Sequence, residues 1–449
     1  MITAEKLGSE HFRDAYGLRY AYVAGAMVKA IASVDMVISL GRAGYLGFYG
    51  AGGMRLGEIE AAIKKIQEAL CNGEHYGINF LSSLARPELE FELVNLLLRY
   101  EVRHIEASAF MNVTPALIKY RLSGLHRDEH QALIAPNKIM AKISRPEIAL
   151  VFMSPPAAHI VERLLSQGEI SASEAALAAY LPVASEVTVE ADSGGHTDMG
   201  VAAVLIPAIL RVREALQQRY QYDTAISVGA GGGIGTPEAA ASAFLLGADY
   251  IVTGSINQCT VEAGTSDLVK DMLQETGVRD TSYAPAGDMF EMGSKIQVMK
   301  KGVFFASKAN KLYDLWRNFG GLEQLELSVQ KDLQEKYFRR SFGEVYDETK
   351  TYYLKEFPSQ IEKAERNPKV KMALVFRWYF VHSMRLARAG VADQRVDFQV
   401  HCGPALGAFN QWVQRTQLES WRQRKVVGVA DHLMQGCAEY INRRWSFFG

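Results

Sequence analysis

The peptide Glu190-Ala-Asp-Ser-Gly-Gly-His-Thr-Asp198 places a histidine directly after two glycines. Gly194 and Gly195 allow the chain to lie flat against a ring system, because glycine lets a backbone approach a ligand closely. His196 follows where its imidazole could reach a substrate above that ring. An imidazole titrates near neutral pH, so it can polarise a carbonyl group or relay a proton. The alternative interpretation is a structural loop histidine.

Two other apolar runs end in glycines and hydroxyls. Gly229–Gly235 is followed by Thr236 and Pro237, which suit the N-cap and first position of a helix. Gly254 and Ser255 end the next apolar run. Backbone N–H groups at a helix start favour an anion, and two successive strand ends of this kind form the phosphate site of βα barrels. These residues predict a bound phosphate group.

Further polar or small residues interrupt predicted strand ends. Lys142 stands in an apolar run and is costly there unless it meets an anion. Either it forms a buried ion pair with a carboxylate, or it faces the barrel mouth and stabilises negative charge on a cofactor. Asn79 binds a heterocycle edge or caps a loop, and the segment 24–27 is a floor for a flat ring or ordinary packing. Together these residues predict a mononucleotide, and FMN is the interpretation we favour.

The elements that must position these residues alternate between short apolar runs and amphipathic segments. Eight such runs occur, at residues 21–27, 44–49, 76–81, 104–109, 138–144, 186–193, 225–230 and 250–256. Strand and helix alternation favours parallel βαβ units, and eight of them favour a TIM (β/α)8 barrel over an open doubly wound sheet. Between the fifth and sixth strands, residues 157–166 and 171–179 predict an additional helical pair, with a capping box from Ser171 to Glu174.

The chain of 449 residues exceeds one barrel of about 250 residues. Residues 1–264 are predicted to form the FMN-binding barrel. Residues 265–449 show no further strand-rich pattern, so we expect an added, mainly helical substrate or lid domain after strand 8. Since a barrel needs an eighth outer helix, the last helix is expected to pack back on the barrel.

Composition describes a globular protein with a large core: the net charge is −1, 22% of residues are charged and 48% are hydrophobic. This balance gives no sign of a nucleic-acid-binding surface. Four cysteines lack metal-ligand spacing, which argues against structural zinc and favours a reducing, cytoplasmic location. No secretory signal is expected, and no apolar run reaches the roughly 18 residues that span a bilayer.

Six segments carry a resemblance to a known family: Glu190–Asp198, Gly229–Glu238, Thr253–Gln258, Ala284–Glu291, Met372–Tyr379 and Cys402–Asn410. The phosphate motif alone would admit many flavin and nucleotide barrels, and the last three segments are much narrower signals. On these segments, which are spread over nearly the whole chain, the sequence resembles the PfaD-like trans-acting enoyl reductases of polyketide and polyunsaturated fatty acid synthases. That family is similar to the nitronate monooxygenase and FMN-dependent enoyl reductase barrels.

The resemblance implies NADPH-driven, FMN-mediated reduction of an α,β-unsaturated thioester on an acyl carrier protein, within a polyketide or fatty acid synthase complex. It implies that His196 and Lys142 are catalytic: Lys142 stabilises negative charge on the flavin, and His196 polarises the thioester carbonyl or relays a proton. The implied cofactor-binding residues are Gly25, Ala26, Met27, Asn79, Lys142, Ser193, Gly194, Gly195, Ala230, Gly231, Gly232, Thr253, Gly254 and Ser255. No metal is implied, and a homodimer is left open.

The sequence departs from the family pattern at Met199-Gly200, at Phe380-Val-His382 and at His401, where an aromatic residue is expected. These departures bear on the acyl substrate more than on the chemistry. Two other functions stay open. One is a nitronate-type FMN oxygenase that uses the same histidine as a base. The other is a non-catalytic flavin-binding scaffold.

Overall fold

The computed structural model describes residues 1–83 and 86–445. The chain divides into two compact units. The first contains residues 1–193, 199–264 and the segment from Ala408 to the last described residue; the second contains Gly194–Asp198 and Thr265–Gly407. A single boundary near residue 265 therefore does not separate the two units. The short segment that carries His196 belongs to the second unit, and the C-terminal segment belongs to the first.

The first unit is built on a closed barrel of eight parallel strands, in the order β1-β11-β10-β8-β7-β4-β3-β2. The strands are β1 (Tyr22–Ala24), β2 (Leu46–Tyr49), β3 (Gly77–Leu81), β4 (His104–Ser108), β7 (Lys138–Ile143), β8 (Glu186–Glu190), β10 (Ser227–Gly231) and β11 (Ile251–Thr253). Each lies within one of the eight apolar runs or overlaps it, so the predicted TIM barrel is confirmed. The runs are apolar because a parallel strand is covered on both faces.

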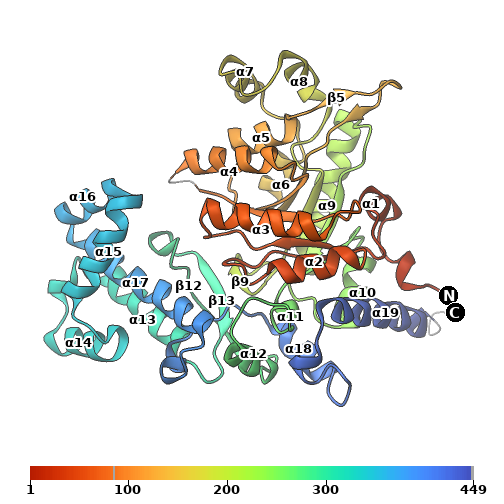
Figure 1. The fold of residues 1–449 in the computed structure, drawn as a ribbon. Helices are drawn as coiled ribbons and strands as arrows, with labels where there is room; N and C mark the ends of the chain where they lie inside the picture. The colour runs from red at the N-terminus through yellow and green to blue at the C-terminus, as the bar shows by residue number, and fades with distance from the viewer. Residues whose placement is uncertain (84–85, 446–449) are drawn as a thin grey trace. The chain divides into compact units, whose positions relative to one another are not determined.

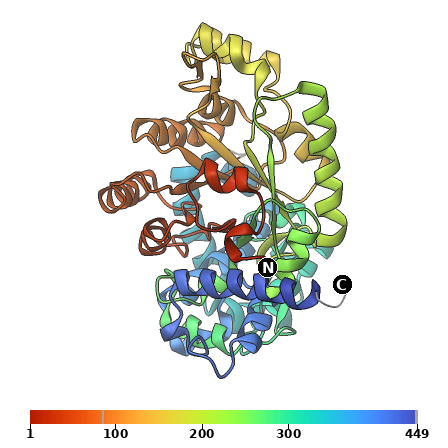
Figure 2. The same cartoon turned by 90° about the vertical axis from the view of Figure 1, so that its right-hand side faces the viewer.

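Helices surround these strands (Figures 1 and 2). They are α1 (Glu10–Ala15), α2 (Val34–Arg42), α3 (Leu56–Ala69), α4 (Pro87–Arg99), α5 (Pro115–Leu122), α6 (Pro146–Phe152), α9 (Ala202–Tyr220), α10 (Pro237–Leu245) and α11 (Ser255–Gln258). The predicted additional pair is α7 (Ala158–Ser166) and α8 (Ala172–Leu177), and Ser171 with Glu174 forms the expected capping box. A small hairpin of β5 (His126–Arg127) and β6 (Leu133–Ile134) was not predicted.

The C-terminal segment completes the barrel. Its helix α19 (Val426–Trp445) packs against α10 and α2, and Figure 2 shows it beside them as a long blue helix. Arg424, which is 1% exposed, precedes this helix and donates to Asn410 Oδ1 at 2.9 Å. Ile2 N donates to Asn442 Oδ1 at 2.8 Å, so the two ends of the chain lie side by side. The last helix therefore supplies the outer layer beside the eighth strand.

The second unit is mainly helical, as expected, but it also contains an antiparallel sheet that was not predicted. Its order is β12-β13-β9, with β12 (Thr281–Pro285), β13 (Lys295–Met299) and β9 (Gly195–Thr197). The sheet was missed because β12 and β13 mix polar and apolar residues, as expected for a sheet with one covered face, and so lack a continuous apolar run.

The rest of this unit is helical. Its helices are α12 (Asp267–Gln274), α13 (Phe305–Asn318), α14 (Leu327–Asp332), α15 (Phe342–Glu356), α16 (Pro358–Arg366), α17 (Pro368–Ala389) and α18 (Pro404–Trp412), which runs into the first unit. Aromatic side chains fill the core: Phe290 packs edge-on against Phe380, and Phe305 stacks on Tyr379. Most of the aromatic residues in this region are thus core.

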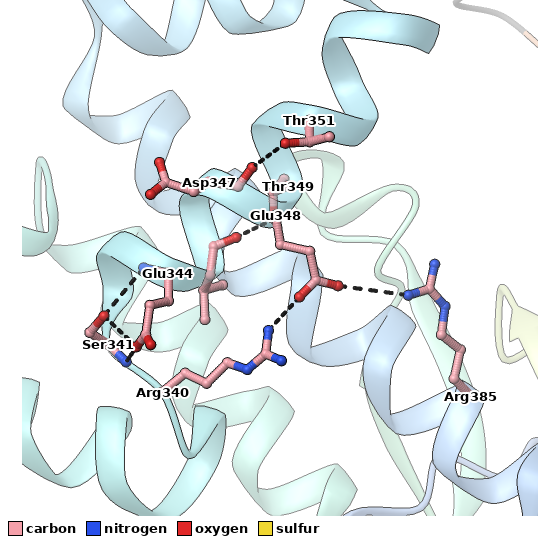
Figure 3. A network of polar contacts seen from close by, with 9 residues as sticks. Arg340, Ser341, Glu344, Asp347, Glu348, Thr349, Thr351 and Arg385 are labelled. Carbon is pink, nitrogen blue, oxygen red and sulfur yellow. Dashed lines mark hydrogen bonds and ion pairs between the residues drawn. The ribbon is translucent and has the colours of Figure 1, made fainter.

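Helix α15 begins with a capping box, in which Ser341 accepts from Glu344 N and Glu344 accepts from Ser341 N. Figure 3 shows Glu348, one turn further on, between Arg340 at 2.5 Å and Arg385 at 3.9 Å. All three side chains are more than 40% exposed. Exposed pairs of this kind add little stability, so packing, rather than this network, holds the helices together.

Candidate functional site

Three ionisable side chains come from adjacent barrel strands: Lys142 on β7, Glu190 on β8 and Glu106 on β4. Lys142 Nζ on β7 lies 3.0 Å from Glu190 Oε1 on β8, and their side chains are 19% and 26% exposed. Burial would lower the pKa of Lys142, but Glu190 and then Glu106 on β4 together hold it above its usual value. Lys142 is therefore charged and paired with a carboxylate. The ion pair is the first of the two roles predicted for Lys142. The second role, stabilising negative charge on a cofactor, was expected at the same end of the barrel.

Glu106 is the third ionisable residue here, and the sequence analysis did not single it out. It is fully buried, its Oε2 accepts from Ala26 N at 3.0 Å, and its Oε1 has no hydrogen-bond partner. Burial raises the pKa of Glu106 to about 7, and the charge of Glu190 adds to this rise. Lys142, the Ala26 N–H and, least of all, Asn79 oppose it. The signal that identified Lys142, a charge within an apolar strand, was equally present here.

Asn79 lies next to Glu106, since their Cα positions are paired across β3 and β4. Its Nδ2 donates to Glu106 O at 3.2 Å and to Ser108 Oγ at 3.1 Å. Its Oδ1 is buried and has no hydrogen-bond partner. A buried polar atom without a partner is costly, so this oxygen and Glu106 Oε1 are both suited to meet a ligand.

The segment Gly25–Met27 leaves β1 beside these groups. Gly25 N donates to Thr253 O at 3.0 Å, and a Cβ at Gly25 would lie 2.8 Å from Val252 Cγ1 and 3.2 Å from Glu106 Oε1. Ala26 holds Glu106 through its N–H, and Met27 O accepts from Ala32 N at 3.1 Å. The predicted small-residue floor is thus packed directly against the buried carboxyl.

The predicted phosphate residues lie at the ends of β10 and β11. Ala230 and Gly231 end β10, and Gly232 follows with φ +87°, where a Cβ would lie 2.6 Å from Ala191 O. Thr236 accepts from Ala239 N as the predicted N-cap of α10, with Pro237 at the first turn.

At the neighbouring strand end, Thr253 Oγ1 is 2.6 Å from Tyr22 OH, and Gly254 precedes α11, which begins at Ser255. A Cβ at Gly233 or Gly254 would meet no atom within 4 Å. This open space beside two helix starts fits a phosphate. With the two unpartnered acceptors of Asn79 and Glu106, the residues present fit FMN.

His196 lies in the second unit, on β9, where it is paired with Ile296 of β13. Its Nε2 is 2.9 Å from Asp288 Oδ1, and the side chains are 40% and 58% exposed. Burial would raise the pKa of Asp288, but the hydrogen bond and the charge of His196 hold it below its usual value. Asp288 lies in one of the segments that carry the family resemblance, but nothing in the sequence gave it a role.

His401 lies close to the same strand. Its Nδ1 would be 3.3 Å from a Cβ at Gly195, and its Nε2 is 2.9 Å from Gln399 Nε2. Burial, and next the charge of His196, lower the pKa of His401 to about 4, although Asp288 acts in the opposite direction. His401 is therefore a neutral ring at neutral pH, which is chemically close to the aromatic residue that the family pattern expects.

The residues predicted for the site belong to two different units of the chain. The barrel unit holds Gly25, Ala26, Met27, Asn79, Lys142, Ser193, Ala230, Gly231, Gly232, Thr253, Gly254 and Ser255. The second unit holds Gly194, Gly195 and His196, which are covalently continuous with Ser193. Within the barrel unit, Ser193 Oγ donates to Glu190 Oε1 at 3.5 Å, so Ser193 lies beside the Lys142 ion pair.

Among residues 1–83 and 86–445, no cluster of three His, Cys, Asp or Glu side chains is arranged to hold a metal ion. Within the same described part of the chain, the helices are all too short or too polar to cross a bilayer.

Comparisons with known proteins agree with this architecture. A family model described as "[Acyl-carrier-protein] S-malonyltransferase, inserted helical domain" matches residues 319–398. The polyketide biosynthesis protein PksE of Bacillus subtilis is 52% identical over 99% of this chain and 57% of its own length. A polyunsaturated fatty acid synthase protein of Thraustochytrium sp. is 42% identical over 98% of this chain and 30% of its own length. The chain therefore spans about half, or less, of these curated relatives.

A solved structure matches over its full length. The crystal structure of the enoyl reductase domain of MlnA, from the macrolactin biosynthesis cluster of Bacillus amyloliquefaciens, is 43% identical. The match covers 99% of both chains with a TM-score of 0.95. The fold is an enoyl-reductase-type barrel with an added unit. The chain belongs to the PfaD-like enoyl reductases associated with polyketide and polyunsaturated fatty acid synthases.

Proposed function

We propose that this protein is a trans-acting enoyl reductase that uses FMN and NADPH to reduce the α,β-double bond of enoyl thioesters on an acyl carrier protein. The observation that carries the proposal is the full-length similarity to an enoyl reductase domain, together with a barrel mouth whose unpartnered acceptors and open glycine ends fit FMN. When bound, FMN would supply the hydride that is added to the double bond.

The residues of the chain would bind the cofactor and handle charge. Asn79 and Glu106 would bind the ring, and the glycines after β10 and β11 would accept the phosphate. Lys142 provides a fixed positive charge where negative charge develops, and Glu190 holds it in place.

His196 would polarise the thioester carbonyl or deliver a proton to the α-carbon. Asp288 favours the tautomer or charge state of the imidazole that has a proton on Nε2, since its carboxylate accepts from that nitrogen. An Asp–His pair of this kind suits a histidine that must hold and then release a proton.

An acyl carrier protein and its synthase are the proposed partners. The relatives carry polyketide biosynthesis or polyunsaturated fatty acid synthase in their names, and the family model that matches residues 319–398 is described for an acyl-carrier-protein transferase. These residues include α15, α16 and all of α17 of the second unit. We assign to this unit the acyl and carrier contacts.

Anaerobic stopped-flow absorbance tests the proposal. The yellow protein is first reduced with NADPH and then mixed with crotonyl thioester on an acyl carrier protein, while the flavin absorbance is followed. We expect rapid reoxidation by the enoyl substrate and its loss in His196→Ala. Reoxidation by oxygen or a nitronate alone would overturn the proposal in favour of the oxygenase. A flavin that NADPH leaves oxidised would favour a scaffold or a different electron donor.

A further inference from the structure

Glu106 is a buried ionisable group of the barrel mouth. The ion pair there joins Lys142 to Glu190 and does not include Glu106. Its side chain is fully buried, and Ala26 N–H donates a hydrogen bond to its Oε2. Its Oε1 is buried and has no hydrogen-bond partner. A charged carboxylate requires several donors or a cation to offset the loss of hydration.

The nearby cation is already matched. Lys142 lies 3.0 Å from Glu190, which neutralises it. The charged groups that act on Glu106 are Lys142 on β7 and Glu190 on β8, and Tyr250, just before β11, is a third titratable neighbour. With one positive charge and one negative charge already paired, a second carboxylate charge would be in excess. Burial accordingly raises the pKa of Glu106 to about 7.

An uncharged Glu106 changes what the site can recognise. A protonated carboxyl adds an O–H donor at Glu106 Oε1, whereas Asn79 Oδ1 is a second unpartnered atom and an acceptor. Asn79 on β3 and Glu106 on β4 are paired with each other across these two parallel strands. A donor beside an acceptor matches a carbonyl beside an N–H, which is the pattern on the pyrimidine edge of a flavin.

We propose that Glu106 binds FMN as an uncharged carboxylic acid, so that uptake of FMN is linked to one proton on this residue. The inference rests on the proposed function, because it takes FMN as the ligand. It goes further by assigning a protonation state to Glu106 in the bound complex and by making cofactor affinity depend on pH. A neutral Glu106 also avoids placing a negative charge beside a ring that receives electrons.

The test is the dissociation constant of FMN between pH 6 and pH 9, measured by quenching of flavin fluorescence on the full chain freed of bound flavin. We expect FMN to bind about tenfold more weakly at pH 8 than at pH 6, because a group that titrates near pH 7 loses its proton over that range. Glu106→Gln is permanently neutral and should lack the tenfold loss that is due to Glu106. The FMN phosphate titrates near pH 6, equally in both proteins, so the ratio of their dissociation constants removes its effect.

Glu186→Gln is the matched control. Glu186 is a buried carboxyl that begins β8, whereas Glu190 ends that strand at the site. The pH dependence of FMN binding should be unchanged in Glu186→Gln. An equal pH dependence in wild type and Glu106→Gln, or an affinity that rises with pH in wild type only, would overturn the inference while leaving the reductase proposal intact. Wild-type protein that binds no FMN at any pH would instead overturn the proposal that FMN is the cofactor.

A second measurement needs no flavin. Infrared difference spectra of the ligand-free chain between pH 6 and pH 9 should show the C=O stretch of a protonated carboxyl that disappears with increasing pH, and Glu106→Gln should lack this change. If Glu106→Gln does not fold, Glu106→Asp serves in both experiments and should shift the midpoint of the transition. A wild-type protein without any such band at pH 6 would contradict an uncharged Glu106.

Discussion

His196 Nε2 lies 2.9 Å from Asp288 Oδ1, and both residues belong to the second unit, although 92 positions separate them in sequence. The pairing joins the peptide after β8 to the loop after β12. The hydrogen bond to Asp288 orients His196, the histidine that we propose handles a proton. Both residues lie in the unit to which we assign the substrate contacts. We therefore expect the carboxylate to act through His196.

Asp288→Asn should lower kcat for the enoyl thioester by about tenfold to a hundredfold, in the range of general acid–base catalysis, with little change in KM. The substitution removes a negative charge that favours the protonated imidazole. The limb of the pH–rate profile that reports His196 should therefore move to lower pH. Steady-state kinetics from pH 5 to pH 9 measure both effects. Glu291→Gln, a nearby change that leaves the His196 contact intact, is the control. An unshifted pH profile in Asp288→Asn would contradict a positioning role.

Lys142→Met should slow reduction of the flavin and lower the stability of the barrel unit. The substitution leaves Glu190 without its cation, and removing one partner of a largely buried pair costs about 3 kcal/mol. Chemical denaturation measures the stability, and anaerobic stopped-flow absorbance with NADPH measures the reduction.

The double variant Lys142→Met/Glu190→Gln separates the two roles of the lysine. It removes both charges, so it should recover most of the stability without recovering the rate of flavin reduction. If the double variant recovers both, Lys142 is a structural residue only.

The barrel could be predicted from sequence because its strands are covered on both faces and read as continuous apolar runs. The sheet of the second unit could not, because β12 and β13 have mixed polarity and β9 contributes only three residues. The pairing of β9 with β13 joins segments that are distant in the chain. A local sequence pattern cannot predict which distant strands pair.

The site divides in the same way. Glycines, His196 and Lys142 were visible because each residue type is unusual in its local setting. The partner of His196 was not, since no spacing rule links a loop histidine to an aspartate 92 positions later. Glu106 is a different case. Its position within an apolar strand was a usable signal, but only the structure shows that one of its oxygens has no partner.

Gly254→Ala should weaken FMN binding by about tenfold or more while leaving the stability of the protein within about 0.5 kcal/mol of wild type. A Cβ at Gly254 meets no protein atom within 4 Å and the residue has a negative φ, so the fold accepts alanine. The methyl group would occupy the space proposed for the phosphate. Fluorescence quenching by the protein measures the FMN dissociation constant. Gly57→Ala on α3, where a Cβ also meets nothing, should leave it unchanged. Equal FMN affinities for Gly254→Ala and Gly57→Ala would place the phosphate elsewhere.

His401→Phe should make the second unit more resistant to acid. The pKa of His401 is lowered from 6.5 to about 4, chiefly by burial and next by His196. Between these values the unfolded chain binds a proton that the folded chain does not. His401 therefore lowers stability as pH falls from about 6.5 to 4, by up to roughly 3 kcal/mol. Phenylalanine cannot titrate, so the difference in denaturant midpoint between pH 7 and pH 4 should shrink. His130→Phe, at an exposed position, should retain the wild-type difference. If His401→Phe also retains it, the folded protein accepts the proton on His401, and the ring is less sheltered than its burial implies.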